Sequence, residues 1–340
     1  MQKNSSMNFD QLFDSFKETH VLIVGDVMLD TYWWGNVERI SPEAPVPVVE
    51  VRHKECRVGG AANVALNTAS LGAKTGIISV IGNDADGKTL LSLMKEQSID
   101  TSFVIESKDR ITTNKVRVMS RNQQMMRLDS EITSDIDTTL EEILVKHVEA
   151  YINAYHPSVV IFEDYNKGVL TSQTIEKLVD ICNQHQIISA VDPKKKNFLS
   201  YKNVTLFKPN LKEVKEGLNM VVEEVDLKKM QHIHHVLHEV LQHQISLITL
   251  SEKGVFYQNQ QKSSIIPTHV RKIADVSGAG DTVIAVVSLV MAVTKQIQLA
   301  AEMANIAGGL VCESVGTVAI EKDKLLIECK RLLSSQAISD

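Results

Sequence analysis

The sequence predicts an α/β fold with a doubly wound, mainly parallel sheet flanked by helices and a small β lid. Three observations lead to this class. Apolar runs of strand length recur along the chain, segments of helical periodicity separate them, and the apolar runs show no polar alternation. Strands that are apolar on both faces are typical of parallel sheets covered by helices on each side. Strand and helix in alternation imply the doubly wound arrangement.

The apolar runs of strand length fall at 20–30, 73–82, 157–165, 186–193 and 245–254. The helical patterns between them cover 61–71, 138–154, 172–185 and 227–242. The first run, HVLIVGDVMLD, ends in Asp30. We therefore expect Asp30 at the end of the first strand.

Two stretches depart from this order. Residues 41–58 carry three prolines and then alternate, and residues 112–131 alternate apolar with basic or polar side chains. Both patterns indicate antiparallel strands outside the main sheet, inserted at about 36–58 and 112–129 as a lid. No repeat, linker or low-complexity segment marks a second unit, so we expect one domain over 10–330, with tails at 1–9 and 331–340.

Composition limits the classes of function. The chain has 340 residues, 44% of them hydrophobic, and a formal net charge of -6, so no global positive field favours nucleic acid as a partner. Its four cysteines lie far apart, which is typical of a reducing compartment. The polar N-terminus lacks a signal-peptide core, and the apolar stretch 282–294 is too short to span a bilayer. We expect a cytoplasmic protein that does not enter the membrane.

The segment ADVSGAGDTVIAVV places a glycine-rich turn directly before an apolar helix. Gly278 and Gly280 let the backbone turn so that the amides from Gly278 through Ala279 to Gly280 point at one place, and the helix N-terminus adds partial positive charge, which together favour an anion. Asp281 stands among these amides. Its carboxylate is either a helix cap or a base that accepts the proton of a hydroxyl attacking a phosphoryl group held by the amides.

The motif DVSGAGDT resembles the signature of the ribokinase-like, or PfkB, carbohydrate kinases. The resemblance implies that Asp281 is the catalytic base and that ATP, Mg²⁺ and in some cases a monovalent cation are bound. The earlier stretch VGGAANVALNTASLGA resembles the family's sugar-contacting signature. It implies that Gly59, Gly60 and Asn63 contact the sugar, and Asp30 matches the family aspartate that binds sugar hydroxyls.

The stretch LFKPNLKEV resembles the family's N-x-x-E motif. The resemblance implies that Asn210 and Glu213 organise the ATP phosphates and Mg²⁺, with Glu213 acting on the metal indirectly, through water. Taken alone, N-x-x-E is an ordinary helix-capping pattern. Ser251, Gly254 and Asn305 are expected to flank the nucleotide.

The resemblance narrows to the bacterial heptose 7-phosphate kinases, through ISPEAPVPVVEV, GGAANVALN, NKVRVMSRNQQMMRLD, DYNKGVLT and VDPKK. It implies phosphorylation of the anomeric hydroxyl of D-glycero-β-D-manno-heptose 7-phosphate, a step toward the lipopolysaccharide core, by a homodimer clasped through the lid strands. Lys115, Arg117 and Arg121 in the lid supply cations for a phosphorylated sugar. Asp164 and Lys167 follow a strand end where substrate contacts occur. No H-x-G-H occurs, so we expect the kinase step only.

Other functions are compatible with parts of the sequence. Another sugar or nucleoside kinase of the same fold would share these motifs, and so would a relative that binds ligand without catalysis. GNDADGKT at 82–89 matches the P-loop pattern of nucleotidases, although Asp84 and Asp86 would place negative charge inside a loop meant for phosphates. His234 and His238 lie one helical turn apart, a spacing suited to a metal. We interpret them as part of a polar helix face.

Overall fold

The computed structural model describes residues 8–121 and 123–333. Its centre is an eight-stranded sheet in the order β14-β13-β12-β11-β10-β9-β1-β4. The strands are β1 (His20–Gly25), β4 (Lys74–Ile78), β9 (Val159–Glu163), β10 (Ile188–Asp192), β11 (Leu206–Phe207), β12 (Ile245–Thr249), β13 (Val255–Gln258) and β14 (Ser263–Ile266). Pairs from β4 to β12 are parallel, and the last two are antiparallel. The mainly parallel sheet is confirmed.

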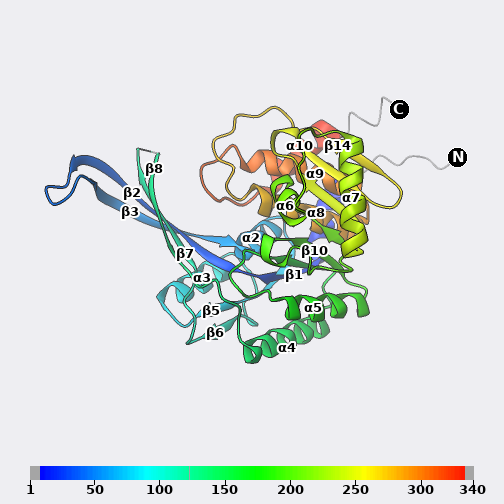
Figure 1. The fold of residues 1–340 in the computed structure, drawn as a ribbon, viewed down its shortest axis with the longest axis horizontal. Helices are drawn as coiled ribbons and strands as arrows, with labels where there is room; N and C mark the ends of the chain where they lie inside the picture. Colours follow the sequence, from blue (N-terminus) through cyan, green and yellow to red (C-terminus); the bar gives the residue numbers. More distant parts are fainter. Residues whose placement is uncertain (1–7, 122, 334–340) are drawn as a thin grey trace.

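Helices cover both faces of this sheet (Figure 1). One face packs against α1 (Phe9–Ser15), α2 (Ala61–Ser70), α3 (Ala85–Glu96), α8 (Ala279–Thr294), α9 (Ile297–Val311) and α10 (Lys322–Leu333). The other packs against α4 (Thr138–Tyr155), α5 (Ser172–Gln184), α6 (Leu211–Gly217) and α7 (Leu227–Leu241). Short 3₁₀ turns occur at η1 (Phe16–Glu18), η2 (Lys195–Asn197) and η3 (Ser251–Lys253).

Alternating side chains of each strand enter two separate cores. In β1, Val21 and Ile23 belong to the core with α2 and α8, whereas Leu22 and Val24 belong to the core with α4 and α5. The reason is that successive side chains of a strand point to opposite faces of the sheet, and helices cover both faces here. Within residues 8–121 and 123–333, no helix is both long enough and apolar enough to cross a bilayer.

The lid is a separate four-stranded sheet that projects from the body (Figure 1). Its strands are β2 (Val27–Ile40), β3 (Pro47–Gly60), β7 (Asn114–Ser120) and β8 (Gln123–Ser130), in the order β3-β2-β7-β8. Both segments predicted to lie outside the main sheet do so. The two hairpins are antiparallel as expected, but β2 and β7, which join them, run parallel. A third, two-stranded sheet pairs β5 (Val80–Gly82) with β6 (Ile105–Ser107).

The first predicted strand, 20–30, is in fact two strands. β1 ends at Gly25, and Asp30 lies inside β2 of the lid, so its expected place at the end of the first strand is wrong. Asp26 ends the main-sheet pairing, because its carboxylate turns to accept amides of the loop after β9. The run 73–82 likewise divides at Ser79 into β4 and β5.

The expected ends of the domain also shift. α1 begins at Phe9 and places Phe13 in the core, and α10 continues to Leu333. The helices at the two ends of the fold therefore extend slightly beyond 10–330. The predicted tails otherwise fall at 1–7 and 334–340, outside the described residues.

Candidate active site

The glycine-rich turn forms the N-terminus of α8. Gly278 is the N-cap residue and has φ of 76°, a left-handed conformation that favours glycine. A Cβ added there would lie 2.9 Å from Nδ2 of Asn63, so space as well as backbone conformation requires glycine. No side chain caps this helix, and although the Ala279 amide donates to the carbonyl oxygen of Val276 at 3.3 Å, the helix N-terminus still favours an anion.

Asp281 is buried in the first turn of α8 and is held by two donors from other parts of the chain. Asn63 of α2 donates to Oδ2 at 2.7 Å, and the Tyr165 hydroxyl donates to Oδ1 at 2.7 Å. The carboxylate therefore does not cap its own helix, and the capping alternative is wrong. Burial raises the pKa of Asp281 above its usual value, and the two hydrogen bonds act against that rise.

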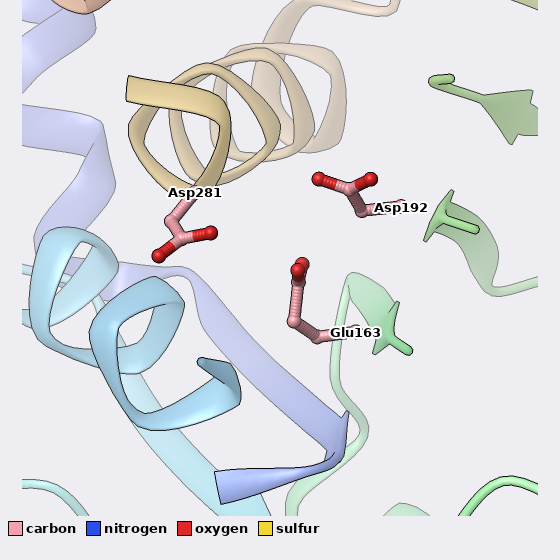
Figure 2. A group of neighbouring side chains, drawn as sticks. All are labelled: Glu163, Asp192 and Asp281. Carbon is pink, nitrogen blue, oxygen red and sulfur yellow. The ribbon is translucent and has the colours of Figure 1, made fainter. Parts of the chain in front are cut away.

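Two further carboxylates approach Asp281 from the main sheet (Figure 2). Glu163 ends β9 and Asp192 ends β10, and one oxygen of each lies within 4.8 Å of the other and of an Asp281 oxygen. Lys208 pairs with Asp192 at 2.5 Å and donates to the carbonyl oxygen of Gly280 at 3.3 Å. Burial, reinforced by Asp192 and Asp281, raises the pKa of Glu163 well above its usual value.

The loop that carries Tyr165 is fixed by Asp26 at the end of β1. The Asp26 carboxylate accepts the amides of Tyr165, Lys167 and Val169 at 2.8, 3.0 and 3.1 Å. Burial raises the pKa of Asp26 to about 6, with a further contribution from the charge of Asp164. One buried side chain thereby sets the position of the hydroxyl that contacts Asp281. No role was predicted for Asp26, Tyr165 or Glu163.

The predicted sugar-contacting residues gather where the lid meets the body. A Cβ on Gly59 would lie 2.5 Å from Oδ2 of Asp30, and Gly60 has φ of 59°, so the two glycines allow the lid strands to approach closely. Asp30 pairs with Arg117 at 2.6 Å. Lys115 is half-buried, and its Nζ lies 5.5 Å from the centroid of the Tyr165 ring. Asp30, Gly59, Lys115 and Arg117 thus lie beside the elements that hold Asp281.

Three predicted substrate contacts lie elsewhere or are engaged. Arg121 is exposed in the turn between β7 and β8. Lys167 pairs with Glu131 at 2.6 Å. Asp164 accepts from Asn197 at 3.0 Å and from Tyr201 at 2.9 Å. The side chains alternate along β9, so Glu163 faces α8 and Asp164 faces the opposite core.

The predicted nucleotide motif forms a reciprocal cap at the start of α6. Asn210 accepts the amide of Glu213 at 2.8 Å, and Glu213 accepts the amide of Asn210 at 2.8 Å. The second Glu213 oxygen accepts from Lys194 at 2.7 Å, and Lys194 also pairs with Asp192 at 3.3 Å. The cap therefore joins the carboxylate group at the strand ends. Its hard oxygen donors fit Mg²⁺, directly or through water.

The remaining nucleotide-side residues follow the neighbouring strand β12, whose Thr249 amide donates to the carbonyl oxygen of Pro209 at 3.1 Å, beside the Asn210 cap. Ser251 lies in η3, and Gly254 has φ of 95° with no room for a Cβ, which would be 1.9 Å from the carbonyl oxygen of Ile266. Asn305 of α9 donates to the carbonyl oxygen of Pro267 at 2.8 Å. These contacts stabilise the β12–β13 turn and the chain that follows β14.

The P-loop match is an ordinary turn into α3. The Asp84 carboxylate accepts the amides of Gly87 at 2.7 Å and Thr112 at 2.8 Å, so it occupies donors that a phosphate would need. Lys88 is exposed on α3. The interpretation of a polar histidine face is wrong for His234, which is buried and contacts the Ser246 hydroxyl at 2.9 Å.

A buried carboxylate beside the N-terminal amides of a helix is suited to phosphoryl transfer. The profile described as pfkB family carbohydrate kinase matches residues 18–324, so this chain belongs to the pfkB family of carbohydrate kinases. It is 37% identical over 308 residues to the bifunctional protein HldE of Helicobacter pylori (strain HPAG1), covering 90% of this chain and 65% of that protein. It is 36% identical to HldE of Aliarcobacter butzleri (strain RM4018), covering 91% and 64%. The chain thus spans slightly less than two thirds of the length of these relatives.

Solved structures show the same fold at lower identity. Phosphofructokinase-2 from Escherichia coli, in complex with potassium, superposes with a TM-score of 0.78 at 18% identity, covering 93% of this chain and 99% of that one. Arabidopsis thaliana ribokinase, complexed with ribose and ATP, gives 0.68 at 17% identity, covering 91% and 98%. Their likeness confirms the ribokinase-like fold class.

Proposed function

We propose that this protein transfers the γ-phosphoryl group of ATP to the anomeric hydroxyl of D-glycero-β-D-manno-heptose 7-phosphate, giving the 1,7-bisphosphate used for ADP-heptose and the lipopolysaccharide core. The arrangement that carries the proposal is Asp281, buried beside the uncapped amides of α8 and oriented by Asn63 and Tyr165. The motif resemblance to heptose 7-phosphate kinases and the 37% identity to HldE support the substrate.

In this reaction Asp281 accepts the proton of the anomeric hydroxyl. The sugar oxygen forms a bond to the γ-phosphorus, and the bond from that phosphorus to the β,γ-bridging oxygen breaks to release ADP. The amides of Gly278, Ala279 and Gly280 stabilise the charge on the transferring group. Glu213 would hold Mg²⁺ indirectly, through water, and the metal would supply positive charge to the nucleotide phosphates.

The sugar is proposed to lie between the lid and the body. Asp30, Gly59, Gly60 and Asn63 contact its hydroxyls, and a half-buried ammonium group at Lys115 recognises its phosphate together with Arg117. Burial lowers the pKa of Lys115, because a poorly hydrated ammonium group loses its proton more easily. An anionic substrate beside Lys115 would favour its charged form.

The test is ADP release with heptose 7-phosphate against ribose, fructose and fructose 6-phosphate. We expect turnover with the heptose phosphate, its loss in Asp281→Asn, and little change in Lys88→Ala, whose side chain is exposed on α3. Turnover with free sugars alone would instead favour another sugar or nucleoside kinase of the family. Activity that survives in Asp281→Asn and disappears in Lys88→Ala would favour a P-loop nucleotidase. No turnover with any sugar would favour a ligand-binding regulator.

We further propose that the protein acts in the cytoplasm as a homodimer joined through its lid sheets. Met125, Met126 and Leu128 on β8 and Ile40 and Val46 near the β2–β3 turn are exposed apolar side chains, and a second lid would cover them. Sedimentation at micromolar concentration as a monomer would contradict the dimer. Turnover in K⁺ compared with Na⁺ tests for a monovalent cation.

A further inference from the structure

The chain between α9 and α10 forms a connecting segment, residues 312–317, that contacts both the lid and the glycine-rich turn before α8. On the lid side, Nη1 of Arg57 in β3 donates to the carbonyl oxygens of Val315 and Thr317, both at 3.2 Å. The Thr317 hydroxyl also donates to Oδ2 of Asp30 in β2 at 3.3 Å. The lid therefore meets the body at this segment, beside the proposed sugar contact Asp30.

The same connecting segment holds the glycine-rich turn from the other side. The Gly316 amide donates to Oδ2 of Asp275 at 2.9 Å, and Oδ1 of Asp275 accepts the amide of Ser277 at 3.0 Å and its hydroxyl at 2.9 Å. A Cβ on Gly278 would lie 3.2 Å from Cγ2 of Thr317. Asp275 and Thr317 thus fix the backbone that leads into the amides at the start of α8.

Arg57 is held in place for this contact by neighbouring lid side chains. Its Nε donates to Glu55 at 2.6 Å, and the indole of Trp34 donates to the other oxygen of Glu55 at 3.3 Å. Its guanidinium carbon lies 4.9 Å from the centroid of the Tyr32 ring, a cation–π distance. Gly316 has φ of 74°, and a Cβ there would lie 2.8 Å from Nη1 of Arg57, so glycine is required for the close approach. Because Nη1 carries two hydrogens, this one nitrogen serves both carbonyl oxygens.

We propose that Arg57 is a positioning residue that couples the lid to the glycine-rich turn. It fixes the connecting segment through two carbonyl oxygens, and that segment fixes Asp275 and hence the amides of Gly278 to Gly280. This role rests on the proposed function in one respect, since those amides act on the transferring phosphoryl group. A misplaced turn weakens binding of the transition state more than binding of the sugar. Loss of the Arg57 guanidinium should therefore lower kcat and leave KM for the sugar nearly unchanged.

The first experiment is steady-state kinetics of Arg57→Met, with the sugar that wild type turns over fastest. Methionine keeps an unbranched side chain over the Tyr32 ring and removes every donor. We expect kcat to fall roughly ten-fold or more, with KM for the sugar within about three-fold of wild type. Arg52→Met is the matched control, because Arg52 lies on the same strand but is exposed and pairs with Glu50 at 3.1 Å. An unchanged kcat in Arg57→Met, or an equal loss in Arg52→Met, would overturn the proposal.

A double-mutant cycle tests whether Arg57 acts through Asp275. The two residues are joined through carbonyl and amide groups of the connecting segment. Asp275→Ala should lower kcat as Arg57→Met does. The double variant should lose little more than the more damaged single variant, because either change releases the same turn. Losses that multiply would show that Arg57 does not act through Asp275, and they would reject the coupling.

Hydrogen exchange of the ligand-free protein separates this proposal from the proposed function. In Arg57→Met the amides of Ser277 and Gly316 should exchange roughly ten-fold faster than in wild type, and in Arg52→Met they should not. If no sugar is turned over, the proposed function fails; faster exchange in Arg57→Met then supports the coupling, and unchanged exchange rejects it. Should Arg57→Met fail to fold, Arg57→Lys takes its place in each measurement, because lysine keeps the positive charge but lacks the planar guanidinium.

Discussion

Replacing Tyr165 with phenylalanine tests how Asp281 is tuned as a base. The Tyr165 hydroxyl donates to Oδ1 of Asp281 at 2.7 Å, and this bond favours the ionised carboxylate. A hydrogen bond to a charged group contributes about 1.5–3 kcal/mol, and one pKa unit corresponds to about 1.4 kcal/mol. Loss of the hydroxyl should therefore raise the pKa of Asp281 by about one to two units.

The assay is the pH dependence of kcat/KM, whose acidic limb reports the ionisation of the base in the free enzyme. Catalysis requires ionised Asp281, so a higher pKa moves the acidic limb to higher pH. We expect this displacement in Tyr165→Phe without a matching change in KM for ATP. A loss of stability alone would lower activity at every pH and leave the position of the limb unchanged.

Tyr201→Phe is the matched control for this experiment. It removes the same hydroxyl from a buried tyrosine that donates to a buried carboxylate, but that carboxylate is Asp164 and the distance is 2.9 Å. The acidic limb should stay where it is in wild type. An unmoved limb in Tyr165→Phe, or equal displacement in both variants, would refute the assignment of Tyr165 as the positioning residue of the base.

Three further outcomes follow from the geometry. Gly278→Ala should reduce kcat roughly ten-fold or more. An alanine in the left-handed conformation costs about 1–2 kcal/mol, and its Cβ would lie 2.9 Å from Asn63. A kcat equal to that of wild type would contradict this. Lys115→Met should raise KM for a phosphorylated sugar and leave KM for ATP unchanged in steady-state assays. Burial lowers the pKa of His234 to about 4 and the pKa of His243 to about 3. Below about pH 6.5 the unfolded state therefore binds more protons than the folded state. The free energy of unfolding should decrease as the pH falls from about 6.5 toward about 4. His243→Asn should flatten that decrease in urea unfolding at several pH values, and an unchanged slope would show that the histidines are not responsible.

The class of fold was predictable because buried parallel strands are recognisable in the sequence as continuous apolar runs. The runs at 157–165 and 186–193 became β9 and β10, and the helical patterns at 138–154 and 172–185 became α4 and α5. The division of the run 20–30 was not predictable. An apolar run shows that residues are buried but not that β1 and β2 belong to different sheets, and only the long-range contacts of Asp26 reveal that change.

The site was predictable where a backbone requirement fixes the residue. The glycine pair at the start of α8 indicated the helix N-terminus, and Asp281 follows directly after it. The choice between Glu163 and Asp164 could not be made from the sequence, because both end the same apolar run and the direction of each side chain depends on the register of β9 in the sheet. Tyr165 gave no signal, since its contact with Asp281 spans 116 residues of sequence.

The three side chains at the base come from widely separated parts of the chain. Asn63 and Asp281 are 218 residues apart, and Tyr165 lies between them on a loop that is itself tied to the end of β1. No contiguous fragment shorter than most of the chain contains this constellation. Turnover is therefore a stringent reporter of complete folding. A nicked protein or a folding intermediate in which any one of these segments is released should have no kinase activity, even where much of its helical structure persists.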